Sequence, residues 1–157
     1  MKQARRLKIV SGGQTGVDRA ALDFAIRHGF AHGGWCPRGR LAEDEIIPDA
    51  YQLHETATPD YGERTEKNVT DSDATLIVVR EKALSGGTAF TRACAERLGR
   101  PVLVICEADG VAKGAAVLSE FLKQNKVRIL NVAGPRESQA PGLGKYVIAL
   151  FEAALGL

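Results

Sequence analysis

Segments that are apolar at almost every position are the feature that most limits how this chain can fold. Residues 74–79 and 101–106 are the clearest examples, and residues 7–10 and 129–132 are shorter ones. A strand that is apolar throughout, rather than at alternate positions, is usually buried on both faces of a parallel sheet. The pattern predicts a Rossmann-like α/β fold with an open, mostly parallel sheet of five or slightly more strands and helices on both faces.

The segments between these runs supply the helices and one irregular region. Apolar residues recur at helical spacing in five segments, which are residues 16–27, 61–69, 85–98, 111–124 and 143–155. A weak fifth strand is expected at residues 34–36. Residues 38–59 have no clear periodicity apart from a brief extended segment at Leu53, and so long a loop in a compact domain is often functional. No linker or repeat interrupts the chain, so we expect one domain over residues 1–157.

Composition excludes several classes of function. The formal net charge of +2 is small, and the Lys and Arg residues are too scattered to indicate a nucleic-acid partner. The apolar runs are far shorter than the ~18 residues that a membrane span needs, and the chain opens without a signal-peptide pattern. The three cysteines lack Cys-x-x-Cys spacing, which favours reduced thiols over disulfides or a zinc site. We therefore expect a cytoplasmic protein without a nucleic-acid partner, a membrane partner or a protein-held metal.

The first apolar strand ends in a glycine-rich turn that opens a helix. The turn reads Ser11-Gly12-Gly13-Gln14-Thr15-Gly16, and Asp18 follows in the first turn of the helix. The free N–H groups at a helix N-terminus favour an oxyanion, and the Gln14 and Thr15 side chains can add hydrogen bonds. The spacing matches neither a P-loop nor the dinucleotide-binding Gly-x-Gly-x-x-Gly pattern. Taken alone, the motif is explained equally well as a tight turn, and Asp18 as a capping residue.

A second glycine turn, Ser85-Gly86-Gly87-Thr88, follows the strand at residues 74–79. Open parallel sheets bind ligands beyond the carboxyl ends of their strands, where the strand order reverses. In a flavodoxin-like order the strands at 7–10 and 74–79 are neighbours, and both turns face one crevice. Two converging helix N-termini favour an anion site over turn chemistry alone.

Four motifs that occur in order resemble a known family. They are Ser11-Gly12-Gly13-Gln14-Thr15-Gly16-Val17-Asp18-Arg19-Ala20-Ala21, Gly34-Trp35-Cys36-Pro37-Arg38-Gly39-Arg40-Leu41-Ala42-Glu43-Asp44, Arg64-Thr65-Glu66-Lys67-Asn68-Val69 before Asp71-Ser72-Asp73, and Ser85-Gly86-Gly87-Thr88. Together they closely resemble the putative molybdenum carrier family, which is similar to the molybdenum cofactor carrier protein of algae. The resemblance is dense over residues 7–106 and only architectural beyond them. It implies a Rossmann-like fold, often a homo-oligomer, and a small anionic ligand, which is the molybdenum cofactor (molybdopterin) or another phosphorylated, nucleotide-like molecule.

One departure from related proteins bears on catalysis. The lysine-decarboxylase-like phosphoribohydrolases of the same superfamily carry Pro-Gly-Gly-x-Gly-Thr-x-x-Glu at the second turn, where the Glu serves catalysis. Here that position falls on Ala93, or on Thr91 in a shorter alignment. The second turn of this chain keeps the phosphate cradle of that motif but lacks the carboxylate of its catalytic Glu. The comparison therefore favours binding over N-glycosidic hydrolysis.

Charged residues of the long loop are further candidates for ligand contact. Arg38 and Arg40 each carry a planar guanidinium suited to phosphate or molybdate, with a solvated loop as the alternative. Glu43 follows in an acidic run that can pair with these arginines, hold a metal, act as an acid or base, or simply be solvated.

Three residues elsewhere complete the set of candidates. Arg64 and Asn68 share one face of the helix at residues 61–69, because residues four apart are neighbours on a helix. That face either lines the crevice or meets solvent. Trp35 either stacks on a planar ring or packs in the core.

Three hypotheses follow from these residues. The favoured one is a binding or carrier protein that holds an anionic ligand between the two glycine turns, with Arg38 or Arg40 closing over it. The second is a nucleotide-processing enzyme that uses Glu43, Asp44 or Asp18 as an acid or base. The third is a regulatory module that senses a nucleotide and signals through an oligomer interface.

Overall fold

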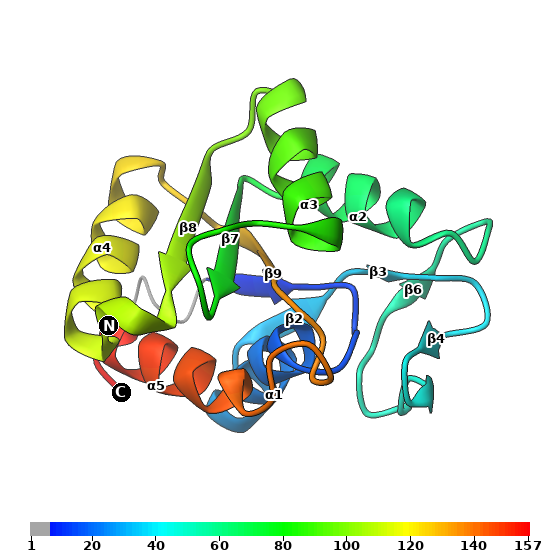
Figure 1. The fold of residues 1–157 in the computed structure, drawn as a ribbon, viewed down its shortest axis with the longest axis horizontal. Helices are drawn as coiled ribbons and strands as arrows, with labels where there is room; N and C mark the ends of the chain where they lie inside the picture. The colour runs from blue at the N-terminus through cyan, green and yellow to red at the C-terminus, as the bar shows by residue number, and fades with distance from the viewer. Residues whose placement is uncertain (1–6) are drawn as a thin grey trace.

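The computed structural model describes residues 7–157, and a five-stranded parallel sheet forms its centre (Figure 1). The strands lie in the order β2-β1-β9-β7-β8. Their bounds are β1 (Lys8–Val10), β2 (Ala31–Gly33), β7 (Ala74–Val79), β8 (Val102–Cys106) and β9 (Ile129–Ala133). The helices are α1 (Val17–His28), α2 (Tyr61–Thr70), α3 (Gly86–Arg97), α4 (Val111–Gln124) and α5 (Leu143–Leu155), with a short 3₁₀ turn η2 (Glu107–Asp109) before α4. The predicted Rossmann-like α/β fold is confirmed.

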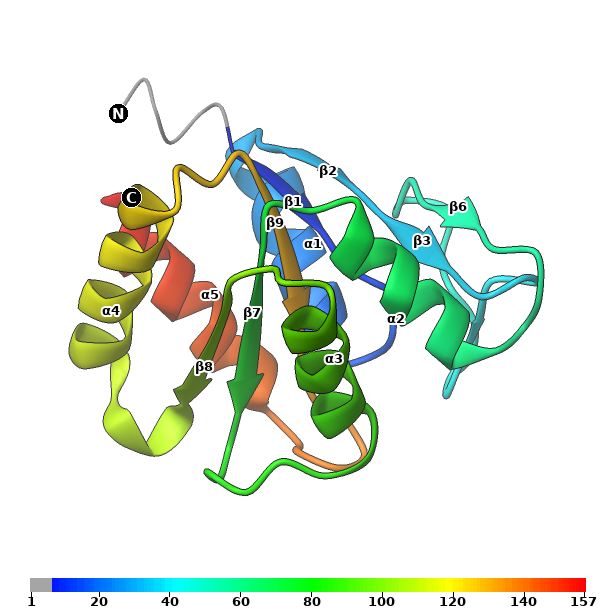
Figure 2. The same cartoon turned by 90° about the horizontal axis from the view of Figure 1, so that it is seen from above.

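Helices cover both faces of the sheet, as Figure 2 shows. Every residue of β7 is buried, because its side chains alternate between two cores. Leu76 and Val78 pack into the larger core with α1, α4 and α5. Ile77 and Val79 point to the opposite face, where α2 and α3 pack. Burial on both sides is the reason that the central strands are apolar throughout.

The second strand of the sheet lies earlier than expected. The sheet strand is β2, whereas residues 35–36 form β3 (Trp35–Cys36) and pair outside the main sheet with β6 (His54–Glu55). β2 is an edge strand with one neighbour, so its sequence Ala31-His32-Gly33 does not need to be apolar and gives no strand signal.

The long loop folds into a small side lobe, residues 35–58. It contains the hairpin of β4 (Leu41–Ala42) and β5 (Glu45–Ile46), and β6 follows directly after Leu53. The fully buried Ile47 packs with Cys36, Ala42 and the half-buried Leu53. The lobe therefore has a small core of its own, although no periodicity in its sequence predicts one.

The expectation that β1 and β7 are neighbours is wrong. β9 lies between them and pairs in parallel with both. The C-terminal strand fits this central place because Leu130 and Val132 are fully buried and Asn131 donates through Nδ2 to Thr75 Oγ1 at 3.3 Å. The carboxyl ends of β1, β9 and β7 consequently lie side by side.

Three further observations on residues 7–157 concern membrane spans, metal-binding clusters and cysteines. No helix among them is long and apolar enough to cross a membrane. They contain no cluster of three or more His, Cys, Asp or Glu side chains able to hold a metal ion. Cys36, Cys94 and Cys106 are free and buried.

Candidate functional site

A cleft of about 880 Å³ opens at the carboxyl ends of β1, β9 and β7. This volume is within the range of small-molecule sites. Its walls come from the two glycine turns, the starts of α2 and α3, and the segment after β9. The polar and glycine residues that line it include Gly12, Gln14, Asp18, Arg64, Thr65, Asn68, Arg80, Ser85, Gly86, Gly87, Thr88, Asn131, Gly134, Arg136 and Gln139. The structure therefore brings both predicted turns to one cleft, although their strands are not neighbours.

The glycines of the first turn are required by contacts within the protein. Gly13 has φ +75°, and a Cβ there would lie 2.6 Å from Leu53 Cδ1 of the side lobe. Gly16 has φ +82°, and its Cβ would lie 2.7 Å from the Pro135 carbonyl oxygen. A Cβ on Gly12 would collide with the Arg64 guanidinium. The turn is thus packed on three sides, and only Gly12, Gln14 and Asp18 of its predicted residues line the cleft.

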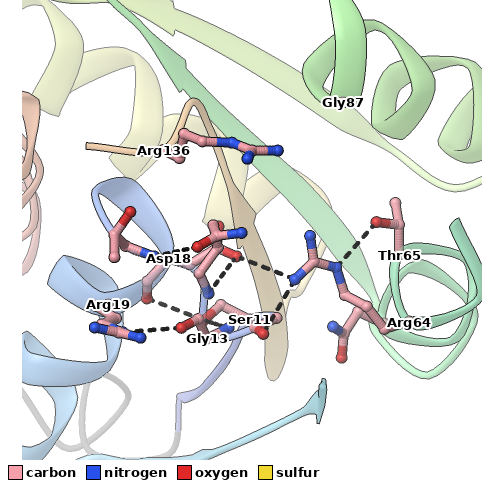
Figure 3. Close-up of polar contacts among 12 residues, drawn as sticks. Ser11, Gly13, Asp18, Arg19, Arg64, Thr65, Gly87 and Arg136 are labelled. Carbon is pink, nitrogen blue, oxygen red and sulfur yellow. Dashed lines mark hydrogen bonds and ion pairs between the residues drawn. The ribbon is translucent and has the colours of Figure 1, made fainter. Parts of the chain in front are cut away.

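Asp18 is a buried carboxylate in the wall of the cleft (Figure 3). The Gln14 N–H donates to its Oδ2 at 3.3 Å, and Arg64 Nη1 lies 3.9 Å from the same oxygen. Burial raises the pKa of Asp18 to about 6, and Arg64 together with the N–H groups of Gln14 and Gly12 opposes this only in part. A carboxylate has about four acceptor positions, so Asp18 retains capacity for further donors.

Gln14 is held in one orientation beside this carboxylate. Its Oε1 accepts from the N–H groups of Thr15 at 3.1 Å and Glu43 at 2.9 Å. Rotating the amide by 180° would turn its NH₂ group toward these two donors, so the two hydrogen bonds fix Oε1 as the accepting end and leave Nε2 as the free end. That nitrogen is buried and has no hydrogen-bond partner within residues 7–157. A buried donor without a partner costs about 1–3 kcal/mol, which favours completion by a ligand or a water molecule.

The second turn is open where the first is packed. Ser85 is the N-cap residue of α3 and makes no side-chain cap, while Thr88 Oγ1 donates back to the Ser85 carbonyl at 2.8 Å. A Cβ on Gly86 or Gly87 would meet nothing within 4 Å. The first-turn N–H groups of α3 therefore face the cleft without a side-chain competitor, and α1 likewise starts without a side-chain cap.

The segment after β9, residues 134–140, forms a wall of the cleft that no motif in the sequence predicts. The Glu137 N–H donates to Thr15 Oγ1 at 3.1 Å, which ties the segment to the first turn. Arg136 lies 5.9 Å from the Tyr61 ring centroid and 3.9 Å from Glu43 Oε2. In Figure 3 its side chain extends over the space beside Asp18 and Arg64. The Ala133-Gly134-Pro135 sequence was a signal for a strand end, but not for a ligand wall.

Arg64 is the predicted cation that reaches the cleft. Its Nη1 donates to the Gly12 carbonyl at 3.1 Å, and its guanidinium lies 5.1 Å from the Tyr61 ring centroid. Asn68 also lines the cleft and holds the backbone of Trp35 through both ends of its amide. The shared helix face proposed for these two residues is thus turned toward the site.

Four other candidates lie outside the cleft lining. Arg40 donates to the carbonyl groups of residues 47, 48 and 51 and so holds the side lobe together, while Arg38 also belongs to that lobe. Trp35 Nε1 donates to Asp71 Oδ2 at 2.8 Å. Glu43 accepts from both the N–H and the Oγ of Ser138, so it joins the lobe to the segment after β9. A closing movement of Arg38 or Arg40 over a ligand has no support in these contacts.

These features define the chain as a Rossmann-like α/β protein with a ligand-sized cleft at the carboxyl ends of its central strands. The model of the circularly permutated YpsA SLOG family matches residues 9–155, and the chain belongs to this family. It is also similar to the solved structure of the putative molybdenum carrier protein of Syntrophus aciditrophicus SB, with 46% identity, a TM-score of 0.92 and 94% of each chain covered. The resemblance to the putative molybdenum carrier family is thereby confirmed. No curated protein matches the chain.

The permutation is visible in the sheet. When the strands are counted from β9, they run β9, β1, β2, β7, β8, and the sheet order becomes 3-2-1-4-5, which is the Rossmann order. β9 then occupies the place of the first strand, and residues 134–140 occupy the place of the first strand-to-helix turn. This explains why a segment near the C-terminus forms a wall of the cleft.

Proposed function

We propose that this protein binds and carries an anionic, phosphorylated ligand of the molybdenum-cofactor class in the cleft between the two glycine turns. The observation that supports this most strongly is that α3 starts at the cleft without a side-chain cap and with open space in front of Gly86 and Gly87. Uncapped helix starts attract phosphate and other oxyanions. The guanidinium groups of Arg64 and Arg136 line the same cleft. The similar protein of Syntrophus aciditrophicus is itself described as a putative molybdenum carrier.

The residues of the cleft suit a ligand of this chemistry. Molybdenum cofactor is a pterin that holds its metal through its own sulfur atoms and carries a phosphate. Such a cargo needs hydrogen-bond donors, a cationic wall and room for a fused ring, and it needs no metal ligands from the protein. A nucleotide offers similar chemistry and is the alternative cargo.

The start of α3 supports carriage over hydrolysis. Thr91, one of the two positions aligned with the catalytic Glu of phosphoribohydrolases, lines the cleft but donates through Oγ1 to the Gly87 carbonyl at 2.8 Å. Ala93, the other position, is exposed on α3 and does not line the cleft. α3 therefore presents no carboxylate to a bound nucleotide from either position.

The test compares ligand binding with turnover. Calorimetric titration with molybdenum cofactor, AMP and GMP is carried out on the wild type and on Gly87→Val, whose side chain enters open space in the cleft. We expect binding to the wild type, a loss of about tenfold or more in the variant, and no release of ribose 5-phosphate from AMP. Ser119→Ala, on α4 outside the cleft lining, is the control and should bind as the wild type does. Equal affinity in Gly87→Val, or ribose phosphate release that Asp18→Asn abolishes, would contradict the proposal.

Homo-oligomer formation and a cytoplasmic location remain predictions. Both come from the family resemblance and the composition rather than from contacts within one chain. Native mass spectrometry with and without ligand measures the first directly, and a ligand-dependent change in mass would favour the regulatory hypothesis.

A further inference from the structure

The two helix starts at the cleft differ in charge. The first turn of α1 contains Asp18, whose carboxylate already accepts from the backbone of the glycine turn. The first turn of α3 contains no acidic residue, and Gly86 and Gly87 leave open space in front of it. A phosphate placed at α1 would meet a carboxylate, whereas at α3 it meets free N–H groups alone. The anionic end of a ligand is therefore favoured at α3.

Asp18 is also unlike the other carboxylates of the cleft. Asp60 is exposed and serves as the N-cap of α2, where its Oδ1 accepts from the Gly62 N–H at 3.0 Å. Glu81 is exposed. Asp18 is only 6% exposed, and its partners do not offset the cost of burying its charge. A buried carboxylate with unused acceptor positions pairs best with two adjacent N–H donors.

Gln14 supplies the complementary group next to this carboxylate. Its backbone N–H contacts Asp18, and its side-chain Nε2 is a buried donor without a protein partner. The pair thus offers a carboxylate that can accept two hydrogen bonds and an amide nitrogen that can donate one. The matching edge on a planar ring has two adjacent N–H donors followed by one carbonyl acceptor. Pterins and guanine share this edge, in their 2-amino group, ring N–H and oxo group, whereas adenine does not have it.

We propose that the ligand lies in the cleft in one direction, with its anionic group at the start of α3 and an amino-oxo pyrimidine edge on Asp18 and Gln14. This inference rests on the proposed function, and it adds the class of ring and the residues that select it. Asp18 is the specificity-determining residue of the pair, because it accepts from the ring N–H and the amino group together. Gln14 Nε2 donates to the oxo group.

The test compares ligands that differ in this edge alone. Titrations at pH 7.5 use GMP against IMP, which lacks the 2-amino group, and AMP, in which the edge is changed. A phosphorylated pterin is compared with the corresponding lumazine, in which an oxo group replaces the amino group. We expect GMP to bind about tenfold or more tightly than IMP, and the pterin to exceed the lumazine by a similar factor. Tighter binding of the pterin than of GMP identifies the pterin as the source of the edge, and the reverse identifies a guanine nucleotide.

Two variants assign the discrimination to Asp18. Asp18→Asn should bind IMP about as well as the wild type does, while losing its preference for GMP. Asp60→Asn is the matched control, because asparagine is also a good N-cap, and it should keep the preference. The wild-type comparison needs no variant, so misfolding of Asp18→Asn does not decide the outcome.

The outcomes separate the two proposals. If the wild type binds none of the phosphorylated ligands, the proposed function fails. If it binds GMP and IMP, or pterin and lumazine, with equal affinity, or prefers AMP, the assigned orientation is overturned while the carrier function stands. Loss of the preference in Asp60→Asn to the same extent as in Asp18→Asn overturns the assignment to Asp18.

Discussion

Replacing Asp18 with asparagine should stabilise the folded protein, and the gain should increase with pH. Burial holds the pKa of this carboxyl at about 6 in the folded state, against 3.8 for the ordinary group. The folded state then binds the proton more tightly than the unfolded state. Stability contributed by such a group is fully present below pH 3.8 and is lost as the pH rises toward 6. Asparagine keeps the shape and the acceptor for the Gln14 N–H but never carries the charge.

The size of the effect follows from the two pKa values. Each tenfold difference in proton affinity corresponds to about 1.36 kcal/mol. Asp18→Asn should therefore raise the free energy of unfolding by about 1 kcal/mol at pH 4.5 and by about 3 kcal/mol at pH 7.5. For a chain of this length, about 3 kcal/mol corresponds to a rise in Tm of roughly 6–12 °C.

Urea unfolding of the ligand-free protein at the two pH values measures this difference. Asp44→Asn is the control. A hydrogen bond and the charge of Arg19 lower the pKa of Asp44, so its contribution is lost only as the pH falls below 3.8. Asp44→Asn should thus change stability by nearly the same amount at pH 4.5 and 7.5. An Asp18→Asn protein that is no more stable than the wild type, or whose gain does not grow with pH, would refute the reasoning.

Three further predictions follow from individual contacts. Gly134→Ala should lower the free energy of unfolding by about 2 kcal/mol or more in urea titrations, because a Cβ there lies 2.5 Å from Val17 Cγ2 and from the Val78 carbonyl oxygen. Gly87→Ala should leave Tm unchanged or raise stability by up to about 1 kcal/mol while weakening ligand binding, so a fall in both would contradict an open cleft wall. Arg19→Ala removes bonds to the Gly13 carbonyl and to Asp44, so limited proteolysis of the side lobe should accelerate about tenfold with unchanged far-UV circular dichroism.

The buried elements were predictable because each carries a local signal. Residues 74–79, 111–124 and 143–155 have the expected bounds, since continuous apolar runs and helical stripes mark burial directly. β2 gave no such signal, because an edge strand with one partner tolerates Ala31-His32-Gly33. The side lobe gives no periodic signal in the sequence, because its strands have two residues each and its core depends on Ile47 and a few neighbours. Local periodicity indicates which residues are buried but not which strands pair, so it does not predict the strand order.

The two glycine turns show most clearly that a sequence motif and a ligand-binding site need not coincide. In sequence they look alike, and both were predicted as cradles for an anion. In space, the glycines of the first turn accommodate Arg64, Leu53 and the segment after β9, while those of the second face open space. The glycines of the first turn, which is the longer motif, are thus required by packing within the protein. This turn contacts the cleft chiefly through Gln14 and Asp18. A buried carboxylate that costs stability at neutral pH, set beside a donor without a partner, is better explained by ligand recognition than by folding.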